Sequence, residues 1–344
     1  GKTRQLSVNW IGLKRGFSEQ ALGMRWHSSH CVVLVSLLLL HAGDSGAARF
    51  PLPADGDDLI GEIQLEKATR SETLLDVARR HDIGQEEIQL ANPSLDRWLP
   101  EENDPLLIPS RYILPEARRE GLVLNLPEMR IYHFPPPGGK DAAAVDTYPV
   151  SIGRMDWKTP LGETRIVSKQ RNPSWRPPQS VRQEAAAEGE SIPQLVPPGP
   201  DNPLGGFALR LGRPGYLIHG TNKPYGVGMR VTHGCVRLLP EDIAELFARV
   251  AAGTKVQIVN QPVKIGWHKG VLYAEIHPPL DEDDTAREDL LRFTLERVYA
   301  ELAQNPAVLD GQALRQAVEK AHGVPVAISK PGASGRSIVN PLFQ

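Results

Sequence analysis

Residues 218–221 read IHGT, and residues 231–238 read VTHGCVRL after a glycine-containing stretch. These two segments bring two histidines close in sequence to one cysteine, Cys235. A cysteine attacks a carbonyl carbon as its thiolate, so a catalytic cysteine needs an imidazole or a positive field nearby. Gly234 lets the backbone approach a substrate closely, and the N–H groups of such a turn can face a developing oxyanion. The pattern therefore predicts an acyl-transfer site.

The whole chain has the composition of an ordinary soluble protein once an export signal is removed. Its 344 residues are enough for two or three domains, with a net charge of −2 and 40% hydrophobic residues. No basic block interleaved with aromatic residues is present, which argues against a nucleic-acid partner. The 31 prolines and 31 glycines favour loops and short strands over a helical bundle.

The N-terminal part of the sequence resembles an export signal. Residues 32–40 form a largely apolar run that follows Arg25 and precedes small residues ending at Ala48, a plausible cleavage site. A membrane span needs roughly 20 apolar residues, so this run is too short to be one. Met24 stands where an initiator is expected, so residues 1–48 are predicted to be an upstream extension and a signal peptide. We expect a periplasmic protein that is not transmembrane; a buried core segment is the alternative.

Cysteine usage supports a reactive thiol. Cys31 lies within the predicted signal and before its apolar run, whereas a lipid-modified cysteine would follow that run. Cys235 is then expected to be the lone thiol of the mature protein, either free and reactive or paired with another molecule.

A small α+β unit is predicted at residues 61–109, after a linker at residues 50–58. Ser71 is expected to be the N-cap of its first helix. Strand, helix, helix and strand are predicted at residues 62–65, 73–81, 86–91 and 106–109. This order, with ANP after the second helix, resembles a LysM domain, which implies binding to the N-acetylglucosamine-containing glycan of peptidoglycan. SETL replaces the usual Gly-Asp-Thr-Leu entry to the first helix, so a degenerate spacer is the alternative.

Residues 121–260 are predicted to form a mainly β domain, a sandwich or a barrel, with the motif on a loop between strands. Residues 172–203 form a long insertion with a short polar helix, and such an insertion usually lines a binding cleft. Residues 261–344 are predicted to be an α+β C-terminal extension. Its expected strand and helices lie at residues 271–276, 284–303 and 310–323.

The segment from His219 to Leu238 resembles the signature of the YkuD-type L,D-transpeptidases, in which a histidine precedes a Ser/Thr-His-Gly-Cys element. The order of signal, LysM-like unit, catalytic domain and tail is similar to the periplasmic proteins that attach Braun lipoprotein to peptidoglycan. The resemblance implies that Cys235 is the nucleophile, attacking the carbonyl between the diamino acid and the terminal D-Ala of a stem tetrapeptide. It implies that His219 is the general base, oriented by Gly220, Thr232 or their neighbours.

The resemblance also implies roles for residues around the pair. The N–H groups of Gly234 and Cys235 would stabilise the tetrahedral intermediate. Many relatives carry Asn at the position of Arg237, whereas the lipoprotein-attaching subgroup carries Arg, as this chain does. Arg237 would bind a substrate carboxylate. Trp175 and Tyr225 would be walls of the cleft, with buried packing as an equal alternative. His233 has either a supporting role or merely satisfies backbone groups.

Neither a metal nor an organic cofactor is expected. The acceptor is an amine, either a diamino acid side chain on another stem or the C-terminal Lys of the lipoprotein. Water as the acceptor would make the protein an L,D-carboxypeptidase or a lipoprotein-releasing hydrolase. Two other interpretations stay open. One is a zinc site formed by His219, His233 and Cys235, although two ligands separated by a single glycine fit tetrahedral geometry poorly. The other is a non-catalytic peptidoglycan anchor.

Overall fold

The computed structural model describes residues 47–53, 56–136, 138, 143–154, 158–284 and 289–330. Almost all of the predicted signal segment, including Met24 and Cys31, lies outside the described residues. At Ala48, the proposed cleavage site, strand β1 (Ala48–Pro51) begins, and it pairs antiparallel with β8 (Ala144–Pro149). The first residues of the predicted linker are therefore part of a sheet edge. None of the described helices has the length and hydrophobicity needed to cross a membrane.

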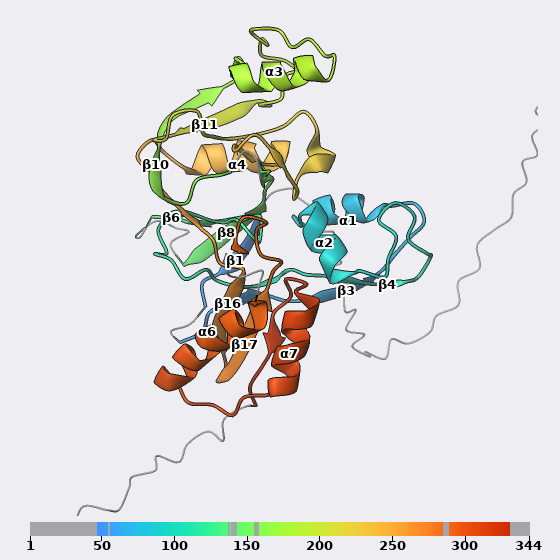
Figure 1. Ribbon diagram of the computed structural model, residues 1–344, viewed down its shortest axis with the longest axis vertical. Helices are drawn as coiled ribbons and strands as arrows, with labels where there is room; N and C mark the ends of the chain where they lie inside the picture. Colours follow the sequence, from blue (N-terminus) through green and yellow to red (C-terminus); the bar gives the residue numbers. More distant parts are fainter. Residues whose placement is uncertain are drawn as a thin grey trace, which may run out of the picture. The chain divides into compact units, whose positions relative to one another are not determined.

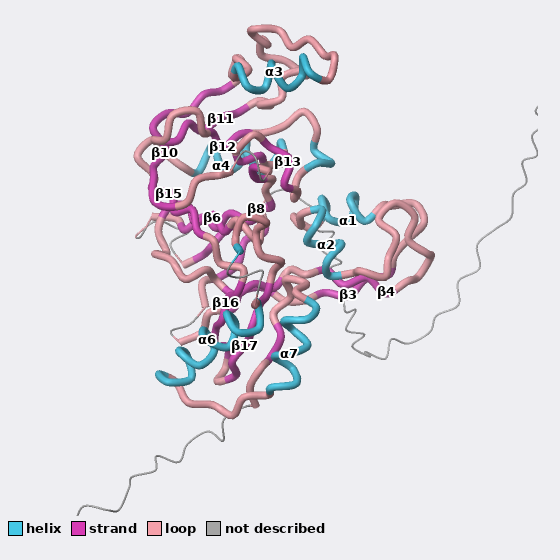
Figure 2. The backbone as a smooth tube through the Cα atoms, viewed as in Figure 1, coloured by secondary structure: helices cyan, strands magenta, loops and turns pink. Residues whose placement is uncertain are grey.

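A curled nine-stranded sheet forms the centre of the described chain (Figures 1 and 2). Its order is β1-β8-β7-β6-β15-β10-β11-β12-β14. Neighbours are antiparallel except β6 with β15 and β12 with β14, which are parallel. The other strands are β6 (Gly121–Asn125), β7 (Arg130–Phe134), β10 (Gly162–Arg171), β11 (Phe207–Leu211), β12 (Leu217–His219), β14 (Val236–Arg237) and β15 (Lys255–Val259).

The curl brings the two ends of this sheet together. A bulge in β10 falls between Ile166 and Ser168, where extra twist bends a strand. Ser151, just after β8, exchanges backbone hydrogen bonds of 2.8 and 3.0 Å with Arg237 of β14. Helix α4 (Pro240–Arg249) packs against β11 and buries Leu246 in the same apolar core as the strands. The predicted mainly β class is confirmed.

The N-terminal unit contains β2 (Leu59–Gly61), β3 (Gln64–Lys67), α1 (Leu74–Arg80), α2 (Gln85–Ala91), β4 (Pro105–Ile108) and β5 (Arg111–Ile113). The expected strand, helix, helix and strand are present. The predicted N-cap is wrong, because Thr73 rather than Ser71 caps α1. The Thr73 hydroxyl accepts from the Asp76 N–H at 3.2 Å, and the Asp76 carboxylate accepts from the Thr73 N–H at 2.9 Å. Serine is on average the better N-cap residue, but here the capping box with Asp76 places the cap at Thr73.

The C-terminal part contains β16 (Val263–His268), β17 (Val271–Ile276), α6 (Leu290–Gln304), α7 (Gly311–Lys320) and β18 (Val326–Ala327). Strands β16 and β18 were not predicted, and the helix expected from residue 284 has its described part at α6. The helices pack on the sheet around Val298, Leu314 and Ala317. The expected polar helix of the 172–203 insertion is α3 (Gln179–Ala187).

Candidate active site

Two short parallel strands bring the histidine and the cysteine together. In the register of β12 and β14, Ile218 lies opposite Val236 and His219 lies opposite Arg237. Ile218 and Val236 are both in the apolar core. Because side chains alternate along a strand, His219 and Arg237 point to the other face, as does Cys235 at the start of β14. The predicted pair therefore shares one non-core face at the rim of the sheet.

His219 is buried and its ring is oriented by its own backbone neighbour. Its Nδ1 lies 2.6 Å from the carbonyl oxygen of Gly220. A carbonyl can only accept, so Nδ1 carries the proton and Nε2 keeps its lone pair. Burial, with a further contribution from the positive charge of Arg237, lowers the pKa of His219 to about 4. The imidazole is neutral at neutral pH and is ready to accept a proton at Nε2. Of the orienting groups proposed from sequence, the Gly220 carbonyl is the one in contact.

The turn that carries Cys235 is fixed by two buried threonines. The Thr232 hydroxyl donates to the Cys235 carbonyl at 2.6 Å, and the Thr159 hydroxyl donates to the Gly234 carbonyl at 3.0 Å. Gly234 has a φ of +92°, a left-handed conformation that favours glycine. The sequence-based expectation of a special glycine here is confirmed, and the carbonyls of Gly234 and Cys235 are both occupied by threonine hydroxyls.

The thiol is neutral in this resting arrangement. Burial raises the pKa of Cys235, while a backbone hydrogen bond from Leu217 and the charge of Arg237 lower it less. Its Sγ lies 3.7 Å from the carbonyl oxygen of Gly215. A neutral thiol beside a neutral imidazole needs proton transfer to become nucleophilic. The two pKa shifts therefore favour a neutral thiol and a neutral imidazole over a preformed ion pair.

Two backbone N–H groups of the turn remain available. Within the part of the chain that the structure describes, the N–H groups of Gly234 and Cys235 have no hydrogen-bond acceptor. Buried N–H groups are nearly always paired, so free ones beside a nucleophile are suited to bind an oxyanion. This geometry is consistent with the role proposed for them from sequence.

Arg237 carries the positive charge of the site. Its side chain is largely buried, and its Nε has no hydrogen-bond partner among the described residues. Burial lowers the pKa of Arg237, and the neighbouring Cys235 opposes this shift. An incompletely paired guanidinium close to a nucleophile is well suited to a carboxylate ligand.

His233 contacts the long insertion. Its Nε2 lies 2.7 Å from a carboxylate oxygen of Glu184 on α3, and the same carboxylate pairs with Arg154. These interactions lower the pKa of Glu184, with the Arg154 hydrogen bond as the largest cause and the His233 bond next. His233 therefore connects α3 to the motif.

The two predicted cleft walls have different surroundings. Trp175 is half-buried and exchanges backbone hydrogen bonds of 2.9 and 2.8 Å with Val196, which join the two sides of the insertion. Tyr225 is 58% exposed and lies in the short 3₁₀ segment η1 (Pro224–Gly226).

A polar pocket of about 300 Å³ lies directly after the histidine strand. Its walls include Thr221 and Asn222 from the strand end and Asn202 from the insertion. The Asn202 amide donates to the carbonyl of Pro173 at 2.8 Å and so holds the insertion closed on itself. His219 itself is not among the residues that line this pocket.

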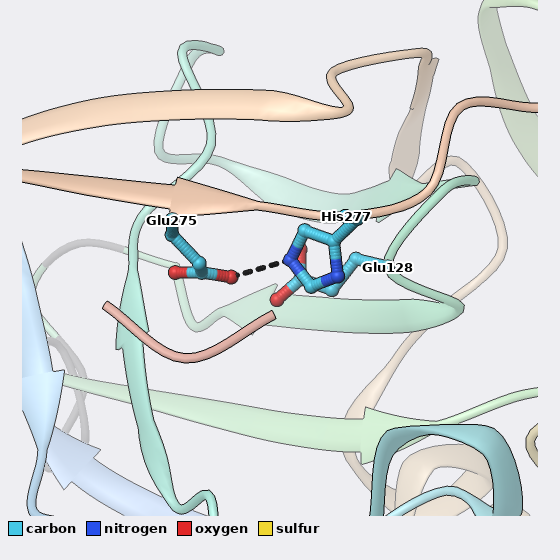
Figure 3. A group of neighbouring side chains, drawn as sticks. All are labelled: Glu128, Glu275 and His277. Atoms are coloured by element: carbon cyan, nitrogen blue, oxygen red, sulfur yellow. Dashed lines mark hydrogen bonds and ion pairs between the residues drawn. The ribbon is translucent and has the colours of Figure 1, made fainter. Parts of the chain in front are cut away.

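A second group of titratable side chains lies away from the motif. Figure 3 shows Glu128, Glu275 and His277, whose potential ligand atoms all lie within 4.8 Å of one another. Lys264 Nζ lies 2.9 Å from Glu128 and 2.7 Å from Glu275. The Lys264 ammonium pairs with both carboxylates and His277 contacts Glu275, so this cluster is a paired structural junction. The zinc reading of the motif gains no support from geometry, because His233 is turned toward Glu184.

Sequence reasoning missed several residues of the site. Thr159, Glu184 and Arg154 lie far from the motif in sequence, and their contacts depend on the curl of the sheet and on the fold of the insertion. No spacing signal in a single sequence identifies such partners. The role of Thr159 becomes visible through its two hydrogen bonds, one from the Gly153 N–H and one to the Gly234 carbonyl.

Comparison with known proteins agrees with this geometry. Residues 119–258 match the L,D-transpeptidase catalytic domain of the YkuD family. Probable L,D-transpeptidase YcfS of Escherichia coli K12 is 36% identical over 298 residues, 85% of this chain and 92% of that protein. Probable L,D-transpeptidase YbiS of the same strain is 38% identical over 83% of this chain and 93% of its own length. Probable L,D-transpeptidase ErfK/SrfK of the same strain is 37% identical over 86% of this chain and 96% of its own length. The chain therefore belongs to the YkuD family of L,D-transpeptidases.

Proposed function

We propose that Cys235 is the nucleophile and His219 the general base of this L,D-transpeptidase, acting on peptidoglycan stem tetrapeptides in the periplasm. The observation that carries the proposal is the placement of both side chains on one non-core face of the β12–β14 ladder, with His219 Nδ1 bound to Gly220. Nε2 is thereby left as the proton acceptor. The export signal at residues 1–48 belongs to the same proposal.

The reaction has two balanced steps. The Cys235 sulfur bonds to the carbonyl carbon of the diamino acid, the bond to D-Ala breaks, and the thiol proton passes through His219 to the leaving amine. An acceptor amine then attacks the thioester, the C–S bond breaks, and the proton of the amine returns through His219 to the thiolate. The N–H groups of Gly234 and Cys235 would stabilise both tetrahedral intermediates, a contribution of about 2.7–4 kcal/mol per donor in a measured case.

Substrate recognition is assigned to the groups around the pair. Arg237 would bind a carboxylate of the stem peptide, and Trp175 and Tyr225 would flank it. Thr232 and His233 support the turn and its contact with α3. We propose the same division of the chain as before, with glycan binding at residues 61–109, catalysis at 121–260 and an extension at 261–344.

The acceptor is decided by a product assay. The protein is incubated with a disaccharide-tetrapeptide and a peptide that ends in the C-terminal Lys of a Braun-type lipoprotein, and products are measured by mass spectrometry. Loss of D-Ala with gain of the Lys peptide would establish lipoprotein attachment, whereas stem-to-stem dimers would establish cross-linking. Free tripeptide without either adduct would contradict the transferase assignment for these substrates and favour a carboxypeptidase.

A further inference from the structure

The loop that leads to the cysteine contacts the N-terminal unit directly. We call residues 222–234 the nucleophile loop and residues 59–113 the N-terminal module. The loop contains η1 and β13 (Arg230–Thr232), which pairs in parallel with β9 (Ile152–Gly153). It separates His219 from Cys235 in sequence, so its conformation sets where the thiol lies relative to the base.

Helix α2 of the module binds the loop through its N-terminal amides. The Gln85 N–H donates to the Val227 carbonyl at 3.2 Å, and the Glu86 N–H donates to the Gly228 carbonyl at 3.1 Å. The first N–H groups of a helix have no partner within that helix, so the loop here supplies the acceptors that would otherwise be missing. The contact is therefore specific in its geometry.

Gly228 permits this close approach. Gly228 has a φ of +88°, and a Cβ at this position would lie 2.3 Å from the Gln85 nitrogen and 2.5 Å from the Gly84 Cα. By contrast, a Cβ on Gly226 in the same loop would meet nothing within 4 Å. The tight contact thus lies at the module and is not a general property of the loop.

Charged side chains reinforce the same interface. Arg79 of α1 makes two hydrogen bonds to Glu241 of α4, at 2.7 and 3.0 Å, close in sequence to β14. Buried Arg130 of β7 reaches the Glu87 carboxylate at 2.6 Å and the Asp82 carbonyl at 3.0 Å. The module is thereby joined to both the sheet and the helix that follows the cysteine.

The other side of the loop is held as well. Arg230 pairs with Asp281 at 3.1 Å and with Glu282 at 2.9 Å, both beyond β17. The Ser151 hydroxyl donates to the Gly226 carbonyl at 2.7 Å. With this side fixed by the sheet and the C-terminal extension, the module supplies the remaining support.

We propose that the N-terminal module is a positioning element of the active site, which holds the nucleophile loop, and with it Cys235, in its reactive place. Arg79 and the turn at Gly84–Glu86 are the positioning residues. The inference rests on the proposed function in taking Cys235 as the nucleophile. A unit tethered only to bind glycan would need none of these loop contacts.

The test compares Arg79→Ala with Arg80→Ala in the full chain. Arg80 is the matched control because its ion pairs are with Glu66 and Glu72 inside the module. Three quantities are measured: amide hydrogen exchange of residues 222–234, the rate of Cys235 alkylation by iodoacetamide, read on its own peptide by mass spectrometry, and kcat and KM with a free tetrapeptide that lacks glycan.

We expect Arg79→Ala to speed exchange of the loop and alkylation of Cys235 by about threefold to fivefold, the scale of one good surface ion pair. Alkylation should rise because exposure removes the burial that raises the thiol pKa. Turnover, in contrast, should fall because the loop is misplaced. We expect the loss in kcat, with KM nearly unchanged. Arg80→Ala should match the wild type in all three, and Arg79→Glu combined with Glu241→Arg should restore them.

Equal loop exchange and alkylation in both variants would overturn the proposal, as would faster exchange with full turnover. Unchanged exchange in β6 and β7 shows that the fold is intact. Gly228→Ala against Gly226→Ala repeats the comparison from the loop side, with the same signs expected. If the wild type has no turnover on the tetrapeptide, the proposed function fails, while exchange and alkylation still decide whether the module holds the loop.

Discussion

Among the described residues, the buried titratable side chains around Lys264 and those around Cys235 differ in how far their charges are paired. Around Lys264, every charge has a partner: Glu128, Glu275, His277 and the Ile113 backbone. Around Cys235, the thiol and His219 are kept neutral by burial and Arg237 is left short of partners. Incomplete pairing leaves groups free to exchange protons and to bind ligands, whereas a complete network stabilises one conformation. The comparison separates a reactive site from a structural junction.

The largest expected effect comes from removing the sulfur. Cys235→Ala should abolish turnover, since no other group at the site forms the thioester. Because the thiol contributes little packing, the free energy of unfolding should change by at most about 1 kcal/mol. Steady-state assays and urea unfolding test this, and residual full activity in this variant would remove Cys235 from the mechanism.

The next effect separates the base from the nucleophile. His219→Gln should lower kcat by about 10²–10⁴, the usual contribution of a general base. In the wild type, kcat/KM should fall on acidification around pH 4, where His219 gains its proton, and not around its ordinary pKa of 6.5. The free energy of unfolding should depend on pH in the same direction. Because the pKa of His219 is lower in the folded than in the unfolded protein, its contribution to stability is present above pH 6.5 and is lost as the pH falls toward 4. An acidic limb near pH 6.5 would show that another group is the base.

At the structural junction, the expected effect is on stability instead of chemistry. Lys264→Met leaves two buried carboxylates without their cation and should cost about 3–5 kcal/mol of unfolding free energy. Lys255→Met is the control: its pair with Glu120 is exposed, and the change should stay within about 1 kcal/mol. Urea unfolding measures both. Under conditions in which Lys264→Met is folded, its kcat should be near that of the wild type. A loss of kcat in the folded variant would contradict a purely structural role for the Lys264 cluster.

The smallest expected effect concerns the contact between α3 and the motif. Glu184→Gln removes the charge that His233 and Arg154 share, so α3 should be held less firmly over the site. We expect KM to rise severalfold with kcat changed less than KM, because the insertion acts on binding. Glu188→Gln, just after the same helix, is the control. A fall in kcat with KM constant would instead place His233 in proton transfer.

Local patterns predicted much of the fold. The hairpin of β6 and β7, both helices of the module and helix α4 follow from alternation, helical spacing and caps. The edge strand β1, the position of the α1 cap at Thr73, two residues after Ser71, and the short strands β14 and β18 were missed. Strands this short have no periodicity to read, and their existence depends on a partner supplied by distant sequence.

The sequence by itself determined which reactive residue types are present and in what order: a cysteine after glycine, a histidine upstream and an arginine two residues beyond, a pattern that predicts a thiol acyl-transfer site. The tertiary structure decided the state of that site. The β12–β14 register places Cys235 and His219 on one face, burial fixes both groups as neutral, and the contacts of α2 and α3 hold the loops around them. Residue types set which reactions are possible, but pKa values and geometry depend on which distant segments exclude water, and a linear pattern does not encode those contacts locally.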